Sequence, residues 1–364
     1  MKSIAVRLER TQQLSHEILI GRHIMDRVGL LMLRHRWASN YVLVADSHVA
    51  SLHACSILET LCSVGLRVHM LEVPPGEGSK SMEICLDLIR RLMLLGADRG
   101  FALLALGGGV VGDLTGFVAS MYMRGIPYVQ IPTTLLAQVD SSIGGKTGID
   151  LPEGKNLVGT FHQPRAVFVD LAFLDTLSQA QIREGLAEVI KYGLIEDPEL
   201  LRKLESSPEL WKNQDPGAME ELVTKCCVIK KRFVEMDEMD RGVRRILNFG
   251  HTVGHAVEAE SGYRLSHGEA VSVGMAAETR ISARLGHLPW EEAMRLEDLL
   301  KSMGLPVRLP RGLSVSQILS RMEKDKKREG GRLPFVLLRR PGLPFLDDSV
   351  GAHLVRDVLE ELGA

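Results

Sequence analysis

Three histidines stand close together in the second half of the chain, and they are the first residues to suggest chemistry. His251 and His255 are four positions apart, which places them on one face of a helix, and His267 follows twelve positions later. Imidazole nitrogens are frequent zinc ligands and also carry protons in acid–base catalysis. The cluster predicts a metal or acid–base site, with capping or core histidines as the alternative. Thr252 stands where the HExxH metalloprotease motif has glutamate, so a metalloprotease site here would lack its general base.

A helix expected at residues 181–195 could supply a carboxylate to the same site. Glu184, Glu188 and Lys191 fall on one side of it at about 100° per residue, and apolar residues fall on the other. Periodicity alone favours a helix whose charged side faces water. The alternative is that the charged side lines a cleft between two domains, and the pattern does not choose between them.

A glycine-rich run at residues 107–112 fits the pattern GxGxxG. It follows a buried strand expected at 101–106 and precedes a helix-like segment at 113–123, so its backbone could approach a diphosphate at a helix N-terminus. The alternative is a tight strand-to-helix turn. The run lies about 100 residues into the chain, and no acidic residue ends the next strand at Ile131. Asp46 does end an earlier strand and could hold a ribose hydroxyl.

A second glycine loop covers residues 140–148 and contains Gly-Gly-Lys-Thr. It is not a Walker A motif, because the leading glycine is missing and position 140 is aspartate. Lys146 on this loop would suit an anion, and Lys155 and Asn156 follow shortly after. A solvated surface charge is the alternative for each lysine.

The elements that must position these residues differ between the two halves. Apolar strands are expected at 41–45, 66–71, 101–106, 128–131 and 166–169, alternating with helices at 49–64 and 79–95, the latter capped by Ser79. This alternation predicts a parallel sheet covered by helices.

The second half is expected to be mainly helical. Helical periodicity marks 181–195, 219–236, 251–260, 268–285 and 290–303; a charged loop at 323–332, a short strand pair near 332–345 and a helix at 350–362 follow. We therefore predict an α/β domain over residues 1–178 and a mainly helical domain over 179–364.

Composition excludes several classes of protein. A length of 364 residues suits two domains, and a formal net charge of −2 argues against a nucleic-acid binder. The longest apolar run has about 11 residues against roughly 20 needed to span a bilayer, and the N-terminus has no signal-peptide pattern. The five cysteines form no CxxC pair and are expected to be small buried hydrophobes in a reducing compartment. These features predict a cytoplasmic protein without nucleic-acid or membrane partners.

Four ordered motifs together carry a family resemblance. They are GGGVVGD at 107–113, IPTTLLAQVDSSIGGKTGID at 131–150, LNFGHTVGHAVE at 247–258 and LSHGEAVSVGM at 265–275. In this combination the chain resembles the 3-dehydroquinate synthase family of sugar-phosphate cyclases. The resemblance implies an N-terminal nucleotide-binding α/β domain with a parallel sheet, a C-terminal, mainly α-helical metal-binding domain, and an active site between them.

The resemblance also assigns site residues. Zinc or cobalt is expected on Glu188, His251 and His267. NAD is expected on Asp46, Glu77, Lys80, Gly108, Gly109, Val110, Asp113, Thr133, Thr134, Lys146, Lys155, Thr176 and Leu177. The substrate and catalytic groups are expected to be Asp140, Lys146, Asn156, Lys191, Lys230, Arg244, Asn248, His255 and Lys326, with Arg124 reaching the substrate phosphate of a neighbouring subunit in a homodimer.

The implied reaction converts 3-deoxy-D-arabino-heptulosonate 7-phosphate to 3-dehydroquinate and phosphate in the shikimate pathway of aromatic amino acid biosynthesis. NAD takes a hydride from C5, phosphate is eliminated, the hydride returns, the ring opens and an intramolecular aldol reaction closes the carbocycle. NAD ends as it began, so the enzyme is a lyase. The substrate carries a carboxylate and a phosphate, which explains the many cationic residues.

Three other readings compete with this one. Another sugar-phosphate cyclase, such as 2-deoxy-scyllo-inosose synthase or a valiolone-forming synthase, would share the metal and NAD motifs. A glycerol dehydrogenase-like oxidoreductase would share the fold, and a non-catalytic nucleotide-binding module would bind NAD without a metal. Two departures from the family pattern are also visible: His48 stands where many members have asparagine, and Asp237–Asp240 replaces the usual Asp-Glu-Arg-Glu.

Overall fold

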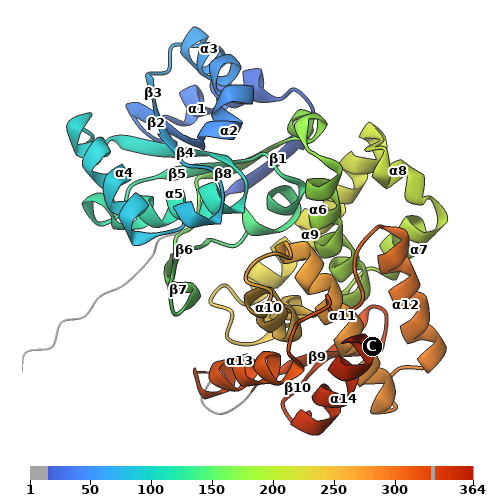
Figure 1. Cartoon of the computed structure of the whole chain (residues 1–364). Coiled ribbons are helices and arrows are strands. Elements are labelled where there is room, and N and C mark those ends of the chain that lie inside the picture. The colour runs from blue at the N-terminus through green and yellow to red at the C-terminus, as the bar shows by residue number, and fades with distance from the viewer. Residues whose placement is uncertain (1–14, 329–332, 364) are drawn as a thin grey trace, which may run out of the picture.

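A six-stranded parallel sheet forms the centre of the N-terminal half in the computed structural model, which describes residues 15–328 and 333–363 (Figure 1). The strands run in the order β1-β8-β5-β4-β2-β3, and every neighbouring pair is parallel. Their bounds are Glu17–Gly21 for β1, Asn40–Asp46 for β2, Val68–Val73 for β3, Phe101–Gly107 for β4, Tyr128–Pro132 for β5 and Ala166–Asp170 for β8. The expected parallel sheet is thus confirmed.

Helices cover both faces of this sheet. Val42 and Val44 of β2 pack with α4 (Met82–Leu94) and α5 (Gly109–Met121), whereas Tyr41 and Leu43 pack on the other face; that face is covered by α1 (Met25–His35) and α3 (Cys55–Ser63). Because both faces are covered, β4 is buried along its whole length, as its continuous apolar sequence predicts.

A two-stranded hairpin that the sequence patterns did not reveal extends from the sheet domain. β6 (Lys146–Leu151) pairs antiparallel with β7 (Gly154–Phe161). Most of β7 is exposed or half-buried, so it has no apolar alternation to recognise. The hairpin, which contains Lys146, Lys155 and Asn156, extends from the sheet domain on the side of the helical half (Figure 1).

The C-terminal half is mainly helical, as expected. Its elements are α6 (Gln179–Ile195), α7 (Pro198–Ser206), α8 (Pro208–Lys212), α9 (Pro216–Met236), α10 (His251–Glu260), α11 (His267–Arg284), α12 (Trp290–Ser302), α13 (Val315–Arg328), β9 (Phe335–Arg340), β10 (Leu343–Asp347) and α14 (Ala352–Gly363). Helix α11 is buried along most of its length because it packs against α6, α10 and α12.

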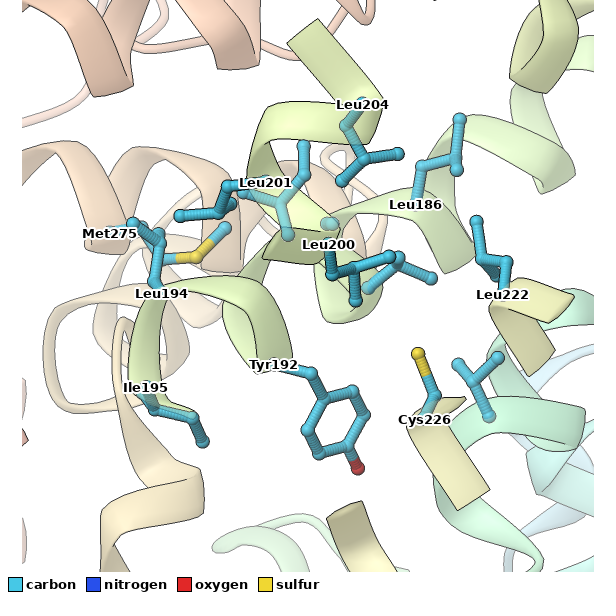
Figure 2. Close-up of a cluster of buried hydrophobic side chains, with 14 of the residues drawn as sticks. Leu186, Tyr192, Leu194, Ile195, Leu200, Leu201, Leu204, Leu222, Cys226 and Met275 are labelled. Carbon is cyan, nitrogen blue, oxygen red and sulfur yellow. The ribbon is translucent and has the colours of Figure 1, made fainter. Parts of the chain in front are cut away.

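One apolar cluster joins the two halves. It contains Val167 and Val169 of β8 together with side chains of α6, α7 and α9. Figure 2 shows part of it, including Leu186, Tyr192, Leu200, Leu204, Leu222 and Cys226. Ser178 caps α6, with its hydroxyl accepting from the Gln181 N–H, and we keep residue 178 as the proposed domain boundary.

Several expectations about local structure were wrong. Ser79 does not cap α4: it ends a 3₁₀ turn at Glu77–Ser79, and the hydroxyl of Ser81 caps the helix by accepting from the Ile84 N–H. Residues 323–328 belong to helix α13 rather than to a loop, and 329–332 lie outside the described residues.

The cysteines only partly follow the expectation that they are buried. Cys55 and Cys62 are exposed, whereas Cys85, Cys226 and Cys227 are buried as predicted. The N-terminal pattern falls on residues 1–14, outside the described part. Within the described part, every helix is too short or too polar to cross a bilayer.

Candidate active site

Three helices bring Glu188, His251 and His267 together. Oε1 of Glu188 lies 3.5 Å from Nε2 of His251 and 3.6 Å from Nε2 of His267. One donor atom from each residue lies within 4.8 Å of the other two. Helix α6 supplies the carboxylate, and α10 and α11 supply the imidazoles. The three residues expected to bind a metal therefore do converge.

The surroundings of these side chains fit a divalent cation. The carboxylate oxygens of Glu188 are buried, and their contacts with the described residues are ionic: Lys191 pairs with Oε2, and the two imidazoles face Oε1. Nδ1 of His251 lies 3.1 Å from the Phe249 carbonyl oxygen, and Nδ1 of His267 lies 3.5 Å from Oε2 of Glu258. These contacts leave both Nε2 atoms facing Glu188. One carboxylate and two imidazoles with anchored outer nitrogens form a donor set that suits zinc or cobalt and leaves positions for substrate oxygens.

Neighbouring charges shift the pKa values of Glu188 and His267 so that both side chains are charged when no metal is bound. Burial opposes ionisation of Glu188, but the charges of Lys191 and His251 lower its pKa to about 2. Burial also opposes protonation of His267, but the carboxylates of Glu188 and Glu258 raise its pKa to about 10. A divalent metal would replace this proton with a larger positive charge at the same place.

His255 lies beside the triad without joining it. Its ring centroid is 5.2 Å from that of His251 and 5.9 Å from that of His267. Burial lowers the pKa of His255 to about 4, so the imidazole is neutral at ordinary pH. A neutral imidazole next to a metal centre can accept or relay a proton.

Close packing of α10 on α11 sets the position of His251. The N-cap of α10 is Gly250, with φ +79°, and its N–H donates to Oε2 of Glu278 on α11 at 2.8 Å. A side chain at Gly274 would overlap the Gly250 carbonyl oxygen, so the two backbones are in direct contact. The distance between His251 and His267 is thus fixed by backbone packing.

A second group of charged residues lies next to the triad. Oδ1 of Asp140 accepts from Nζ of Lys230 at 2.7 Å and from the Tyr192 hydroxyl, and Lys230 also donates to the Asp140 carbonyl oxygen at 2.7 Å. Burial opposes the charge of Asp140, but Lys230 and Lys191 hold its pKa well below the usual value. Lys191 forms an ion pair with Glu188, so it connects Asp140 with the metal candidate.

Further cations come from both halves of the chain. Arg244 is buried, and its guanidinium donates to the carbonyl oxygens of Gly144 at 3.2 Å and Glu238 at 2.6 Å. Lys146 at the start of β6 forms an ion pair with Asp240. Both contacts join a glycine loop of the N-terminal half to the segment after α9.

Polar contacts also join the β6–β7 hairpin to residues after β3 and at the start of α5. Nζ of Lys80 donates to Oδ2 of Asp113 at 2.9 Å and to Oδ1 of Asn156 at 2.6 Å. Nζ of Lys155 lies 3.1 Å from Oε1 of Glu77.

Several residues expected to bind NAD lie at the carboxyl ends of the parallel strands, and we call this edge of the sheet the nucleotide edge. The order β3-β2-β4-β5 reverses between β2 and β4, and in parallel sheets ligands bind outside the strand ends at such a reversal. Asp46 ends β2, Gly108 follows β4 as the N-cap of α5, and Thr133 and Thr134 follow β5. A side chain at Gly108 would press on Thr134, so glycine lets the backbone after β4 approach the segment after β5 closely.

Comparison with known proteins decides between the open alternatives. Residues 70–184 match the family model described as 3-dehydroquinate synthase N-terminal, and residues 185–328 match the C-terminal one. A 3-dehydroquinate synthase of Desulforamulus reducens is 45% identical over 329 residues, covering 90% of this chain and 92% of the relative. The chain belongs to the 3-dehydroquinate synthase family. The family predicted from the four motifs is confirmed, and the alternatives are not favoured.

Solved structures of related cyclases share the whole fold of this family member. The 2-epi-5-epi-valiolone synthase ValA from Streptomyces hygroscopicus, solved with NAD⁺ and Zn²⁺, has a TM-score of 0.91 at 28% identity and covers 98% of this chain and 99% of its own. A 2-deoxy-scyllo-inosose synthase, solved with carbaglucose-6-phosphate, NAD⁺ and Co²⁺, has a TM-score of 0.87 at 29% identity, covering 94% of this chain and 96% of its own.

Some residues that the family resemblance assigns lie outside the central cluster. Arg124 is exposed, with φ +67°, beyond the far end of α5, which is about 20 Å long. Thr176 is exposed near His53, whose Nε2 lies 3.1 Å from its hydroxyl, and Leu177 follows it. The backbone of Lys326 lies in α13, but its side chain is outside the described part.

Two other expected groups keep partners of their own. Oδ1 of Asp46 accepts from the N–H groups of His48 and Val49, both at 2.9 Å, so the carboxylate caps a short helix. Asn248 ends the 3₁₀ turn Val243–Asn248, three residues before His251, and Val110 lies in the first turn of α5.

Sequence reasoning missed three residues that support the site in this member of the family. Glu258 contacts His267, Tyr192 donates to Asp140, and Glu278 accepts from Gly250. One signal was available: Glu258 lies seven positions after His251, two turns along the same helix face.

Proposed function

We propose that this chain converts 3-deoxy-D-arabino-heptulosonate 7-phosphate to 3-dehydroquinate and phosphate, with NAD and Zn²⁺ or Co²⁺ as cofactors. The observation that carries the proposal is the convergence of Glu188, His251 and His267 beside buried Lys191 and Lys230, which are linked through Asp140. Two solved cyclases with the same fold contain NAD⁺ and Zn²⁺ or Co²⁺, which supports the choice of cofactors.

Two groups of this chain's residues would bind NAD and the metal. Glu188, His251 and His267 would hold the metal, while Asp46, the Gly108–Gly109 loop, Asp113 and the threonines after β5 would hold NAD. When bound, the metal supplies Lewis acidity at a substrate hydroxyl, and NAD supplies temporary storage of a hydride.

The substrate's two anionic groups need cations that are positioned in advance. We propose that cations from both halves supply them, together with Asn156 on the hairpin. Lys191 contacts Glu188 directly, and the others are Lys146, Lys155, Lys230 and Arg244. Arg244 presents a planar guanidinium suited to a carboxylate. His255, neutral and next to the triad, is placed to accept or relay the proton that leaves during elimination, together with Asn248 and the departing phosphate.

The decisive experiment measures phosphate release from heptulosonate 7-phosphate by the purified chain. Release should stop with chelator and return with added zinc or cobalt. Failure under every metal condition would overturn the proposal. Turnover of glucose 6-phosphate or sedoheptulose 7-phosphate instead would identify another cyclase, and net accumulation of NADH would identify a dehydrogenase.

We also propose a homodimer that works in the cytoplasm. Arg124 is exposed and held at an unusual backbone conformation away from its own chain's cluster, which suits a residue that completes the site of a second copy. The five free cysteines suit a reducing compartment. Light scattering tests the dimer, and fractionation of the source cells tests the location.

A further inference from the structure

Glu258 on α10 is almost fully buried, and its two carboxylate oxygens have different partners. Its exposure is 4%. Oε2 lies 3.5 Å from Nδ1 of His267, and Oε1 accepts from Nζ of Lys155 at 2.8 Å. A buried carboxylate with two such partners is more than a solvated helix charge, and neither the motifs nor the family comparison gives it a role.

The contact with His267 concerns the orientation of a metal ligand. A carboxylate that accepts from Nδ1 fixes both the tautomer and the ring plane, so that Nε2 keeps a free lone pair. In this chain that lone pair faces Glu188, whose Oε1 lies 3.6 Å from Nε2. Without Glu258, the ring of His267 would lose its outer anchor.

The contact with Lys155 reaches across the two halves of the molecule. Lys155 lies on β7 of the hairpin, which belongs to the N-terminal half, and its Nζ also lies 3.1 Å from Oε1 of Glu77. The ring of Tyr263, just after α10, lies 4.8 Å from the same Nζ. Glu258 therefore links a metal-binding imidazole of the helical half to a lysine at the nucleotide edge.

We propose that Glu258 is a positioning residue that couples metal binding to NAD binding. One of its oxygens orients His267 for the metal, and the other holds Lys155 and hence the hairpin beside Glu77. A metal that orders His267 and Glu258 also fixes Lys155 in place, so each ligand favours the other. The inference rests on the proposed function, because it needs both cofactors to bind.

The test uses the full chain freed of metal with a chelator. Cobalt affinity is measured by competition with a coloured chelator, and NAD affinity is measured with and without cobalt. Glu258→Ala should lower cobalt affinity about 10- to 100-fold, the size found for outer partners of metal-binding histidines. Glu258→Gln keeps an oxygen for His267 but loses the ion pair with Lys155, so it should retain more cobalt affinity and lose the coupling with NAD.

Two further variants sharpen the result. Glu260→Gln is the matched control on the same helix, since Glu260 pairs with Arg321 instead, and it should leave cobalt affinity and coupling unchanged. Lys155→Met should remove the coupling while cobalt affinity stays within about threefold of the wild type, because the contact between Glu258 and His267 remains.

The outcomes separate this inference from the proposed function. If the wild type binds no cobalt, the metal site itself falls and this inference falls with it. If the wild type binds cobalt and folded Glu258→Ala binds it equally well, only the inference is overturned. Should Glu258→Ala not fold, unchanged coupling in Glu258→Gln overturns it and lost coupling supports it.

Discussion

Glu188 and Lys191 lie one turn apart on α6 and form an ion pair that is almost completely buried, with side-chain exposures of 0% and 2%. The ammonium group of Lys191 also acts on Asp140, which has a second cationic partner in Lys230. In the metal-free protein, the charge of buried Glu188 is thus compensated chiefly by Lys191. A metal on Glu188 would take over part of that compensation.

Lys191→Met should destabilise the metal-free protein strongly. Removing one partner of a buried ion pair costs about 3–5 kcal/mol because the other charge stays uncompensated. Urea unfolding with chelator measures the loss, and added zinc should recover part of it. Lys231→Met, at an exposed pair with Glu235, is the control and should change stability by less than about 1 kcal/mol. Equal stability of the two variants would contradict the prediction.

His255→Ala should lower kcat by more than about tenfold, which corresponds to about 1.4 kcal/mol of activation free energy. The His255 ring centroid lies 5.2 Å from that of His251 and 5.9 Å from that of His267, the two proposed metal ligands, and the imidazole is neutral, so it could accept the leaving proton. Steady-state phosphate release measures the change. His353→Ala, at an exposed histidine on α14, should leave kcat unchanged. A smaller loss at His255 would exclude an essential role.

Gly274→Ala should weaken metal binding by changing how α10 packs on α11. The new methyl group would overlap the Gly250 carbonyl oxygen and press α10 away from α11, so His251 would move relative to His267. Overpacking of this kind costs about 1–3 kcal/mol or more of stability. Thermal unfolding and cobalt titration measure both effects. Gly351→Ala, where a methyl group meets open space, should change neither.

Glu278→Gln should change how stability depends on pH. Burial raises the pKa of Glu278 from 4.5 to about 8, so between these values the folded protein keeps a proton that the unfolded chain releases. The stabilisation is therefore full at low pH and is lost as pH rises toward 8. Glutamine accepts the same Gly250 N–H without ionising.

The measurement for Glu278 compares urea unfolding of both proteins from pH 5 to pH 8 with chelator present. The free energy of unfolding of the variant should rise relative to wild type by up to about 1.4 kcal/mol per pH unit across this window. Parallel pH profiles for the two proteins would show that the buried carboxyl group does not titrate there.

Local patterns predicted most elements because each depends on its own residues. The continuous apolar run of β4 and the periodicity of α6, α9 and α11 are visible in the sequence and are present in the structure. The hairpin β6–β7 was missed because its second strand faces solvent and carries no alternating pattern. Both Ser79 and Ser81 are residue types that can cap a helix. Ser79 is part of a 3₁₀ turn, so the helix begins later and Ser81 caps it.

The site was harder to predict, because burial of a charged face depends on distant partners. The periodicity of α6 left open whether the side of Glu188 and Lys191 faces water or a cleft, and the structure buries both side chains. The face is buried because α11 packs against α6, while Lys191 compensates Glu188 from within the same helix. Burial of this kind depends on residues of other elements, which the pattern of one helix does not contain. The family motifs supplied what periodicity could not.

The backbone contact between Gly250 and Gly274 has a consequence for divergence. The spacing of His251 and His267 is set by main-chain atoms, whereas several cations expected to recognise the substrate lie on the hairpin and the segment after α9. Apart from Lys155, these cations can therefore change without disturbing the spacing of the two histidines. A molecule built in this way can acquire new substrates over evolutionary time while keeping one chemistry.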